Sequence, residues 1–225
     1  MVRIIESKSE KLKIAAEIYW GENVDPQANS QTFDNVKCLA IDPALNNTGW
    51  AVIRNEVVLR TGIIAAGKNV KKGVGMSPAE YNFLKCFFTA TILNKVIQEH
   101  DIELICGELP TGGAKSATAI KSMALATGTI TGLAAGTGLN VLWASPSEVK
   151  AALTGDNKAK KLTIMLAVAE HFSFPVETPV RCSAVEVTGR YRFEVGTDTY
   201  GVGAFEHIAD AICAYMACVW RTEMT

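Results

Sequence analysis

The stretch CLAIDPALNNTGWAVI at residues 38–53 decides the fold of this chain. A short apolar run ends on a single acid, Asp42, and a second apolar run begins after the turn residues between Pro43 and Gly49. Apolar runs of this length between turn residues are typical of buried strands. We therefore predict two consecutive strands, with the Asp42 carboxylate at the inner end of the first.

The Asp42 carboxylate needs a partner in such a place, because a buried unpaired charge is costly. A proton, a cationic side chain or a metal ion would compensate it. The nearest cations are poorly placed, because Lys37 points to the opposite face of the strand and Arg54 lies at the far end of the next one. A metal ion is one hypothesis, and an aspartate that only caps a turn is the other.

The composition suits one compact domain with added segments. The chain has 225 residues, with 48% hydrophobic and 20% charged, and its net charge of -1 excludes a global basic field that attracts nucleic acid. Six cysteines without a CxxC pair indicate buried free thiols in a reducing compartment rather than a zinc site. No apolar run reaches about 18 residues and no signal peptide is visible, so we expect no membrane span.

Periodicity and turn residues divide the chain into elements. Five strands are predicted, at residues 36–42, 49–54, 57–66, 102–109 and 140–144. Helices are predicted at about 78–100, 114–137, 146–153, 158–172 and from 204 onward. Residues 1–35 are predicted to be an N-terminal extension, a helix at 6–20 plus a linker, and residues 36–225 the main domain. Proline and glycine mark residues 173–204 as an insertion that forms a β-hairpin or lid.

Three glycines recur every four residues in the helix predicted at 114–137: Gly128, Gly132 and Gly136. Each glycine costs a helix about 1 kcal/mol relative to alanine. The cost makes sense if another backbone approaches this face closely. We expect the sheet to lie there, with a second subunit as the alternative.

Two further acidic positions could join Asp42. Glu108 ends the fourth predicted strand, although a strand-end acid facing solvent is the plain alternative. His207 and Asp210 are three residues apart and share a face of the last helix. Small residues continue that face and would let the helix approach the sheet: Ala211, Ala214 and Cys218.

If the first and fourth strands are neighbours, Asp42 and Glu108 end side by side, and Asp210 joins them. Three carboxylates at one point repel one another and cannot all ionise unless cations share the site. Oxygen-rich sites suit Mg²⁺ or Mn²⁺. Two such ions, roughly 3.5–4 Å apart, can activate water and stabilise the leaving oxygen in phosphodiester cleavage.

Lysines gather in two places that suit phosphate groups. Lys150 lies on a short helix, and Lys158, Lys160 and Lys161 open the next helix, where the dipole disfavours cations. Cations placed against that preference indicate a phosphate target, although solvated lysines are common. A basic, glycine-containing loop at 67–75 is a second candidate for phosphate contact, or simply a solvated run.

These motifs carry a family resemblance. The order of strands and helices, followed by a late acidic helix, looks like the RNase H fold. Residues 41–53 resemble the opening motif of the RuvC Holliday junction resolvases, Glu108 resembles their second acid, and residues 207–211 resemble their closing motif. The spacing from Lys150 to Lys161 is similar to that of the family's DNA-contacting lysines. The resemblance covers about residues 36–172 and 204–220.

The resemblance implies an α/β, RNase H-like fold with a five-stranded mixed sheet flanked by helices. It also implies a homodimeric, Mg²⁺-dependent endonuclease, with Mn²⁺ as a substitute, that nicks four-way or other branched DNA by two-metal-ion hydrolysis. Such a protein would act in the cytoplasm of a bacterium or a phage-infected host.

The implied roles follow residue by residue. Asp42 would bridge two metal ions, Glu108 and Asp210 would each bind one, and His207 would hold a metal or orient the attacking water. Lys150 and Lys161 would contact phosphates of the scissile strand, with Lys158 and Lys160 as helpers.

Some features depart from the family. Members often carry an aromatic just after the second acid, whereas residues 109–113 hold none. The extension and the insertion resemble those of virus- or phage-type members. Two alternatives stay open: a fragment of an actin-like or sugar-kinase-type ATPase, and a catalytically silent protein that binds DNA junctions.

Overall fold

The computed structural model describes residues 33–110, 116–173, 182–187, 190–196 and 198–223. The helix predicted at 6–20 and its linker up to residue 32 fall outside these residues. The strands and helices, in chain order, are β1 Cys38–Asp42, β2 Thr48–Arg54, β3 Val57–Ile64, α2 Ala66–Asn69, α3 Pro78–His100, β4 Leu104–Glu108, α4 Ala117–Thr137, β5 Asn140–Ala144, α5 Pro146–Thr154, α6 Lys161–Ser173, β6 Cys182–Val187, β7 Arg190–Val195, β8 Asp198–Gly201 and α7 Val202–Glu223.

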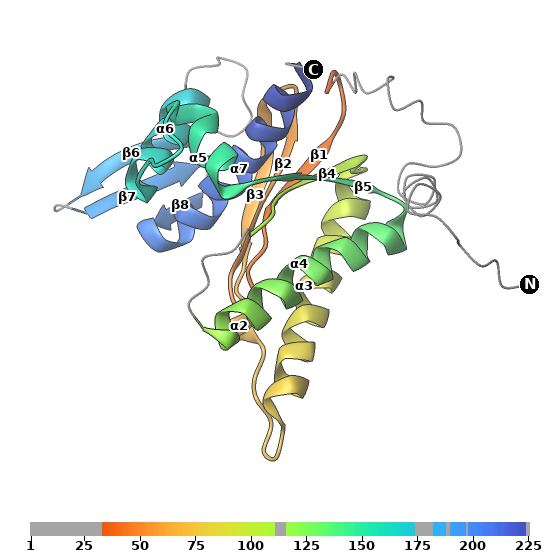
Figure 1. Cartoon of the computed structure of the whole chain (residues 1–225). Coiled ribbons are helices and arrows are strands. Elements are labelled where there is room, and N and C mark those ends of the chain that lie inside the picture. The colour runs from red at the N-terminus through yellow and green to blue at the C-terminus, as the bar shows by residue number, and fades with distance from the viewer. Residues whose placement is uncertain (1–32, 111–115, 174–181, 188–189, 197, 224–225) are drawn as a thin grey trace, which may run out of the picture.

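The central layer is a five-stranded mixed sheet in the order β3-β2-β1-β4-β5. β1 is antiparallel to β2 and parallel to β4, and β4 is parallel to β5. Helices α3 and α4 cover one face, and α5, α6 and α7 cover the other (Figure 1). The predicted five-stranded mixed sheet flanked by helices is therefore confirmed.

Strand β1 is buried on both faces. Leu39 and Ile41 point into the core beneath α3 and α4, while Cys38 and Ala40 point into the core beneath α7. A strand covered on both sides reads as a continuous apolar run, which is why the sequence identified it. The side chains toward α7 are small, and this lets that helix lie close to the sheet.

Gly49 is the point of closest approach between α7 and the sheet. It pairs with Asp42 across β1 and β2, and a Cβ atom placed on it would lie 2.1 Å from the backbone oxygen of His207. No side chain fits in that space. The glycine of the opening motif therefore allows α7 to bring His207 next to the end of β1.

We expect Gly49→Ala to destabilise the protein by about 1–3 kcal/mol, because an extra methyl group in a packed interior forces the backbone apart. Denaturant unfolding measures this. The control is Gly128→Ala, since a Cβ atom on Gly128 meets nothing within 4 Å. That change should stabilise α4 by about 0.5–1 kcal/mol. Equal stabilities for the two variants would contradict the account of Gly49.

The expectation that the α4 glycines pack against the sheet is wrong. Among the described residues, nothing lies within 4 Å of a Cβ atom placed on Gly128, Gly132 or Gly136. The buried face of α4 is formed by Ala126, Ile130 and Ala134 instead. These residues precede the glycines by two positions, about 200° around the helix, so the glycines face outward.

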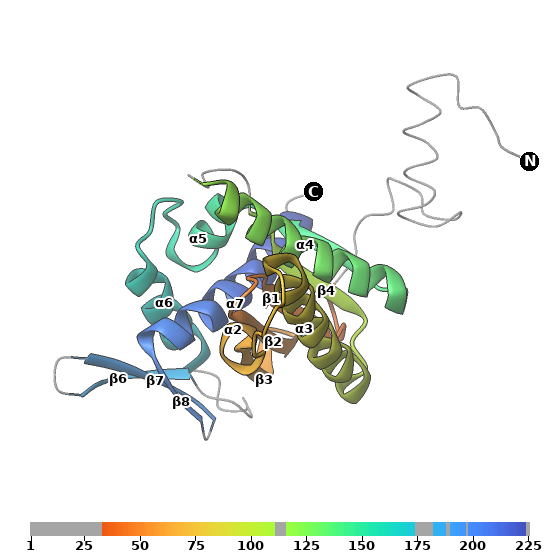
Figure 2. The ribbon, with the colours of Figure 1, turned by 90° about the horizontal axis from the view of Figure 1, so that it is seen from below.

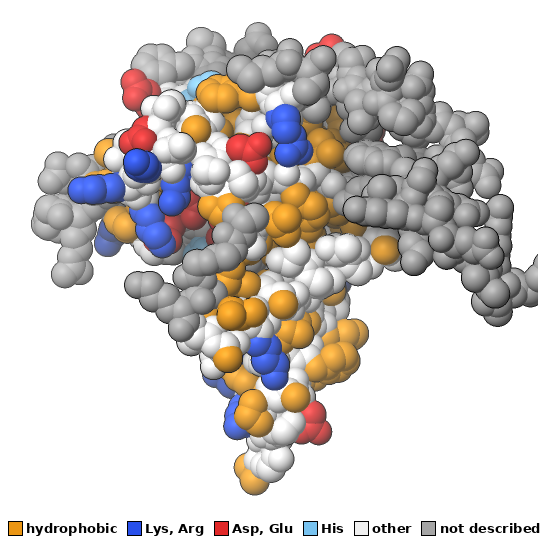
Figure 3. Space-filling model, viewed as in Figure 1, with side chains coloured by type: hydrophobic (Ala, Val, Ile, Leu, Met, Phe, Trp, Pro, Cys, Tyr) orange, Lys and Arg blue, Asp and Glu red, His pale blue; other side chains and the backbone are white. Residues whose placement is uncertain are grey.

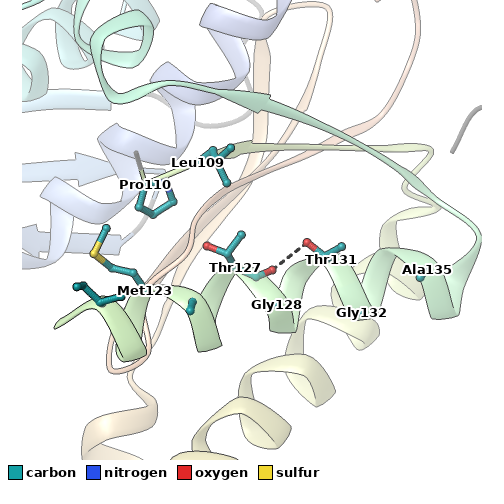
Figure 4. A pocket seen from close by; sticks show the side chains of 10 residues that line it. Leu109, Pro110, Met123, Thr127, Gly128, Thr131, Gly132 and Ala135 are labelled. Carbon is teal, nitrogen blue, oxygen red and sulfur yellow. Dashed lines mark hydrogen bonds between the residues drawn. The ribbon is translucent and has the colours of Figure 1, made fainter. Parts of the chain in front are cut away.

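An open groove of about 670 Å³ runs along the glycine face of α4 (Figure 4). Leu109 and Pro110 form its other side. Within it, the Thr131 hydroxyl donates a hydrogen bond of 3.1 Å to the carbonyl oxygen of Thr127. In the part of the chain that the structure describes, no other element covers the glycine stripe.

The insertion predicted at 173–204 contains more than a hairpin. Strands β6, β7 and β8 form a three-stranded antiparallel sheet beside α6 and α7 (Figure 2). Phe193 of β7 stacks on Phe205 of α7, with ring centroids 4.1 Å apart and planes 5° apart. This contact fastens the small sheet to the first turn of α7.

Several predicted bounds also shift. β3 ends at Ile64 rather than at residue 66, and the short helix α2 occupies part of the predicted loop at 67–75. α6 begins at Lys161, so Lys158 and Lys160 precede the helix rather than open it. The last helix begins at Val202, two residues before its predicted start.

Helix α7 is long and apolar enough, by length and composition alone, to cross a membrane between Val202 and Arg221. Two-thirds of that segment, 67%, is buried within the structure. Its side chains form much of the adjoining core, as expected for the central helix of a globular domain. We therefore interpret α7 as a core helix.

Candidate active site

The carboxylates of Asp42 and Glu108 end two neighbouring strands. β1 and β4 run parallel, and Ile41 pairs with Gly107, so the next residue of each strand lies at the same edge of the sheet. The predicted adjacency of the two acids is confirmed. Both side chains are partly buried at this edge.

His207 supplies the partner that Asp42 requires. Its Nδ1 lies 2.7 Å from Oδ2 of Asp42, although the two residues are 165 positions apart in the chain. This hydrogen bond raises the pKa of His207 above its ordinary value. Lys37 and Arg54, the cations nearest to Asp42 in the sequence, are not its partners. The Asp42 carboxylate is instead paired with His207 of α7.

Burial raises the pKa of Glu108 to about 7, and the charge of Asp42 adds to the effect. Burial likewise raises the pKa of Asp210 to about 7, with further contributions from Asp42, Glu108 and Glu206. Asp210 therefore shares the electrostatic environment of both strand-end acids. These repulsions are the ones that a bound cation would relieve.

The donor set has the chemistry of a divalent-cation site. It consists of three carboxylates and an imidazole, and Mg²⁺ and Mn²⁺ prefer oxygen ligands. Among the described residues, however, no three His, Cys, Asp or Glu side chains lie close enough together to hold one ion as they stand.

The raised pKa values predict how stability depends on pH. Glu108 and Asp210 bind protons more tightly in the folded state than at their ordinary pKa values of 4.5 and 3.8. In EDTA, the contribution of these two carboxyl groups to stability should therefore fall as pH rises from about 4 to 7. Each tenfold difference in proton affinity between the folded and unfolded states changes the free energy of unfolding by at most roughly 1.4 kcal/mol. Solvent screening makes the actual change smaller.

Asp210→Asn should consequently stabilise the metal-free protein at pH 8 by about 1–3 kcal/mol, because a buried, repelled charge is removed. Thermal unfolding at pH 5 and pH 8 measures this. Asp34→Asn, at an exposed acid of the same type, is the control and should change little. A variant at position 210 that is less stable at pH 8 than the parent would contradict the electrostatic account.

Two of the four predicted lysines lie near the acids. The charges of Lys150 and Lys161 oppose the effect of burial on the pKa of Glu108, and Lys161 does the same for Asp210. Lys158 and Lys160 are exposed on the loop before α6. The backbone N–H of Lys158 donates to Asp156 Oδ1 at 2.8 Å, which shapes that loop.

Glu206 is a site residue that the sequence analysis missed. Its carboxylate forms an ion pair with Nζ of Lys161, and this hydrogen bond raises the pKa of the lysine. A signal was present, because Glu206 and Asp210 are four residues apart and therefore share a helix face. Glu206 holds Lys161 beside the acids.

Comparison with known proteins agrees with this geometry. Residues 38–179 match the family described as crossover junction endodeoxyribonuclease RuvC. The RuvC crossover junction endodeoxyribonuclease of Pseudarthrobacter chlorophenolicus is 29% identical over 126 residues, which are 56% of this chain and 62% of that relative. The alignment thus spans less than two-thirds of the relative.

Solved structures of the same type share the fold. The RuvC of T. thermophilus, in complex with a Holliday junction substrate, has a TM-score of 0.57 and 18% identity, covering 84% of this chain and 96% of that one. A yeast mitochondrial Holliday junction resolvase has a TM-score of 0.50 and 8% identity, covering 94% and 89%. The predicted RNase H-like fold is confirmed by these similarities.

Proposed function

We propose, since this chain belongs to the RuvC family of crossover junction endodeoxyribonucleases, that it cleaves four-way or other branched DNA junctions. The observation that carries the proposal has three parts: Asp42 and Glu108 end neighbouring strands, His207 is hydrogen-bonded to Asp42, and the charges of both acids act on Asp210. The family match includes Asp42 and Glu108 but ends before α7. The proposal includes His207 and Asp210 of α7 because of their contacts with and charge effects on the two strand-end acids.

Mg²⁺, with Mn²⁺ as a substitute, is the proposed cofactor, with two ions per site. Asp42, Glu108 and Asp210 would hold the ions, and His207 is proposed as a further ligand or as the group that orients the attacking water. When bound, such ions activate water and stabilise the leaving oxygen of a phosphodiester. Two carboxyl groups with pKa values near 7 must lose their protons first, so cation affinity should rise with pH up to about 7.

The remaining residues position the substrate. Lys150 and Lys161 are proposed to bind phosphates of the scissile strand, because their charges already act on the acids. Lys158 and Lys160, on the adjoining loop, are proposed to extend this contact. The hydrogen bond with His207 holds Asp42 in one orientation, and Asp42 would contribute to holding both ions.

A homodimer is the proposed assembly, since symmetric nicking of a four-way junction needs two active sites. The α4 groove supports this choice, because its outward glycines permit close approach of a second backbone. Sedimentation velocity with and without junction DNA tests it and shows whether DNA is needed. A protein that stays monomeric in both conditions would exclude the dimer.

We propose that residues 1–35 are an extension to the nuclease domain at 36–225 and that the β6–β8 insertion belongs to that domain. The proposed place of action is the cytoplasm of a bacterium or of a phage-infected host. Virus- or phage-type membership is a proposal that rests on these added segments.

The deciding experiment is a nicking assay with Mg²⁺ on a four-way junction, a flap and a linear duplex in parallel. We expect paired nicks in the junction, with 5′-phosphate and 3′-hydroxyl ends, and little cleavage of the duplex. Binding without nicking would favour the silent junction-binding alternative. ATP hydrolysis without nicking would favour the ATPase alternative, which the comparisons do not favour.

A further inference from the structure

A basic projection extends from the sheet at residues 66–85, which we call the arm. It consists of α2, the loop that follows it and the first turns of α3. Figure 1 shows this segment reaching beyond the end of the sheet, below the strands. An element that projects in this way contributes little to the core, so its exposed side chains are free to meet a partner.

The exposed charges on the arm are nearly all positive. Lys68, Lys71 and Lys72 are exposed, and within the described residues none of them forms an ion pair. The arm contains one acid, Glu80, whose carboxylate accepts a hydrogen bond of 2.8 Å from the backbone N–H of Ser77 in a helix cap. Because the whole chain has a net charge of -1, this excess of positive charge is local.

The base of the arm is fastened to the loop that follows Asp42. Nζ of Lys85, a buried lysine, donates to Oδ1 of Asn46 at 3.0 Å and lies 4.5 Å from the centre of the Tyr81 ring. The backbone N–H of Gly67 donates to the carbonyl oxygen of Asn46 at 2.9 Å. Both ends of the arm are therefore held by Asn46, which lies in the turn between Asp42 and β2.

The arm and the start of α6 each carry exposed lysines. Figure 3 shows one group of basic side chains on the upper lobe and another on the projection below it. Two separated basic groups on either side of an active site suit a long polyanion.

We propose that the arm is a second DNA-binding element, which contacts backbone phosphates of a duplex branch away from the scissile phosphate through Lys68, Lys71 and Lys72. The proposal rests on the proposed nuclease function. The arm adds affinity without selecting sequence, because lysine contacts to phosphates carry no base information. Because the base of the arm is bonded to Asn46, the arm would hold the bound duplex branch at a fixed distance from the loop that follows Asp42.

The test is the salt dependence of binding to a four-way junction in EDTA, where no cleavage occurs. Each lost phosphate contact lowers the slope of log K against log salt by about 0.9. The triple variant Lys68→Ala, Lys71→Ala, Lys72→Ala should therefore lose about two to three units of slope.

Two controls accompany the triple variant. Lys95→Ala removes an exposed lysine from the far part of α3 and should leave the slope unchanged. Replacing the three arm lysines with arginine keeps the charge and should retain the parental slope. Thermal unfolding of each variant should match the parent, because the substituted side chains are exposed.

The outcomes separate the two proposals. A parent protein that binds and nicks the junction, with an unchanged slope in the triple alanine variant, overturns the arm proposal alone. A parent that neither binds nor nicks branched DNA overturns the nuclease function, and the arm proposal falls with it. A slope retained by arginine but lost with alanine supports the arm proposal.

Discussion

Asp42→Asn is expected to reduce junction cleavage by at least about a thousandfold, which corresponds to about 4 kcal/mol of transition-state stabilisation. Asparagine keeps the shape of the side chain and can still accept a hydrogen bond from His207, so the fold should survive. It cannot supply the negative charge that the proposed cations require. Single-turnover nicking in Mg²⁺ measures the loss.

Junction binding by this variant should remain within a fewfold of the parent, because removing a negative charge beside DNA does not weaken electrostatic attraction. Asp34→Asn, at an exposed acid outside the proposed catalytic set, should cleave normally. An Asp42→Asn protein that nicks the junction at the parental rate would show that the proposed catalytic set is wrong.

Lys161→Ala is expected to slow cleavage by about a hundredfold and to lower the salt slope of binding by about 0.9. The lysine opens α6, and its charge acts on Glu108 and Asp210. In the DNA-free protein it is paired with Glu206. The proposed phosphate contact requires Lys161 to leave this carboxylate for a phosphate of DNA, and losing the lysine removes that contact.

The effect should be specific to this position. Lys95→Ala, at an exposed lysine of α3, serves as the matched control and should leave both rate and slope unchanged. If Lys161→Ala keeps the parental slope while the parent shows a clear one, then Lys161 does not bind a phosphate. A lower cleavage rate with an unchanged salt slope of binding would instead show that Lys161 acts only on the carboxylates of the site.

The sheet could be predicted because its strands carry a strong signal. β1 and β4 are buried on both faces and read as apolar runs, each ending on an acid. Ser77 and Ser145 also begin their helices as predicted, since both form capping boxes. Short polar elements carry no such signal, which explains why the strand Asp198–Gly201 and the four-residue helix α2 were not predicted.

The orientation of α4 could not be predicted from its residues. Alanine, threonine and glycine occur on every side of this helix, so no single stripe is distinctly apolar. The glycines then suggested close packing against the sheet, while Ile130 marked the buried side. Only the three-dimensional arrangement shows that the glycines face the open groove.

The residues of the candidate site could be predicted from the sequence, but the hydrogen bond between two of them could not. Asp42 and Glu108 follow from strand ends, and His207 and Asp210 follow from a polar pair above small residues on one helix. The hydrogen bond between His207 and Asp42 joins distant segments, and no local pattern indicates it. The one nearby sequence feature related to this hydrogen bond is Gly49, because its lack of a side chain makes room for the backbone of His207.

The most direct test of the central claim is anomalous diffraction from crystals soaked in Mn²⁺. The account predicts manganese peaks bounded by carboxylate oxygens of Asp42, Glu108 and Asp210, at coordination distances of about 2.1 Å. The three side chains must draw together around the ions for this to occur. Well-ordered crystals in which these carboxylates stay apart, with no manganese between them at saturating concentration, would contradict the account.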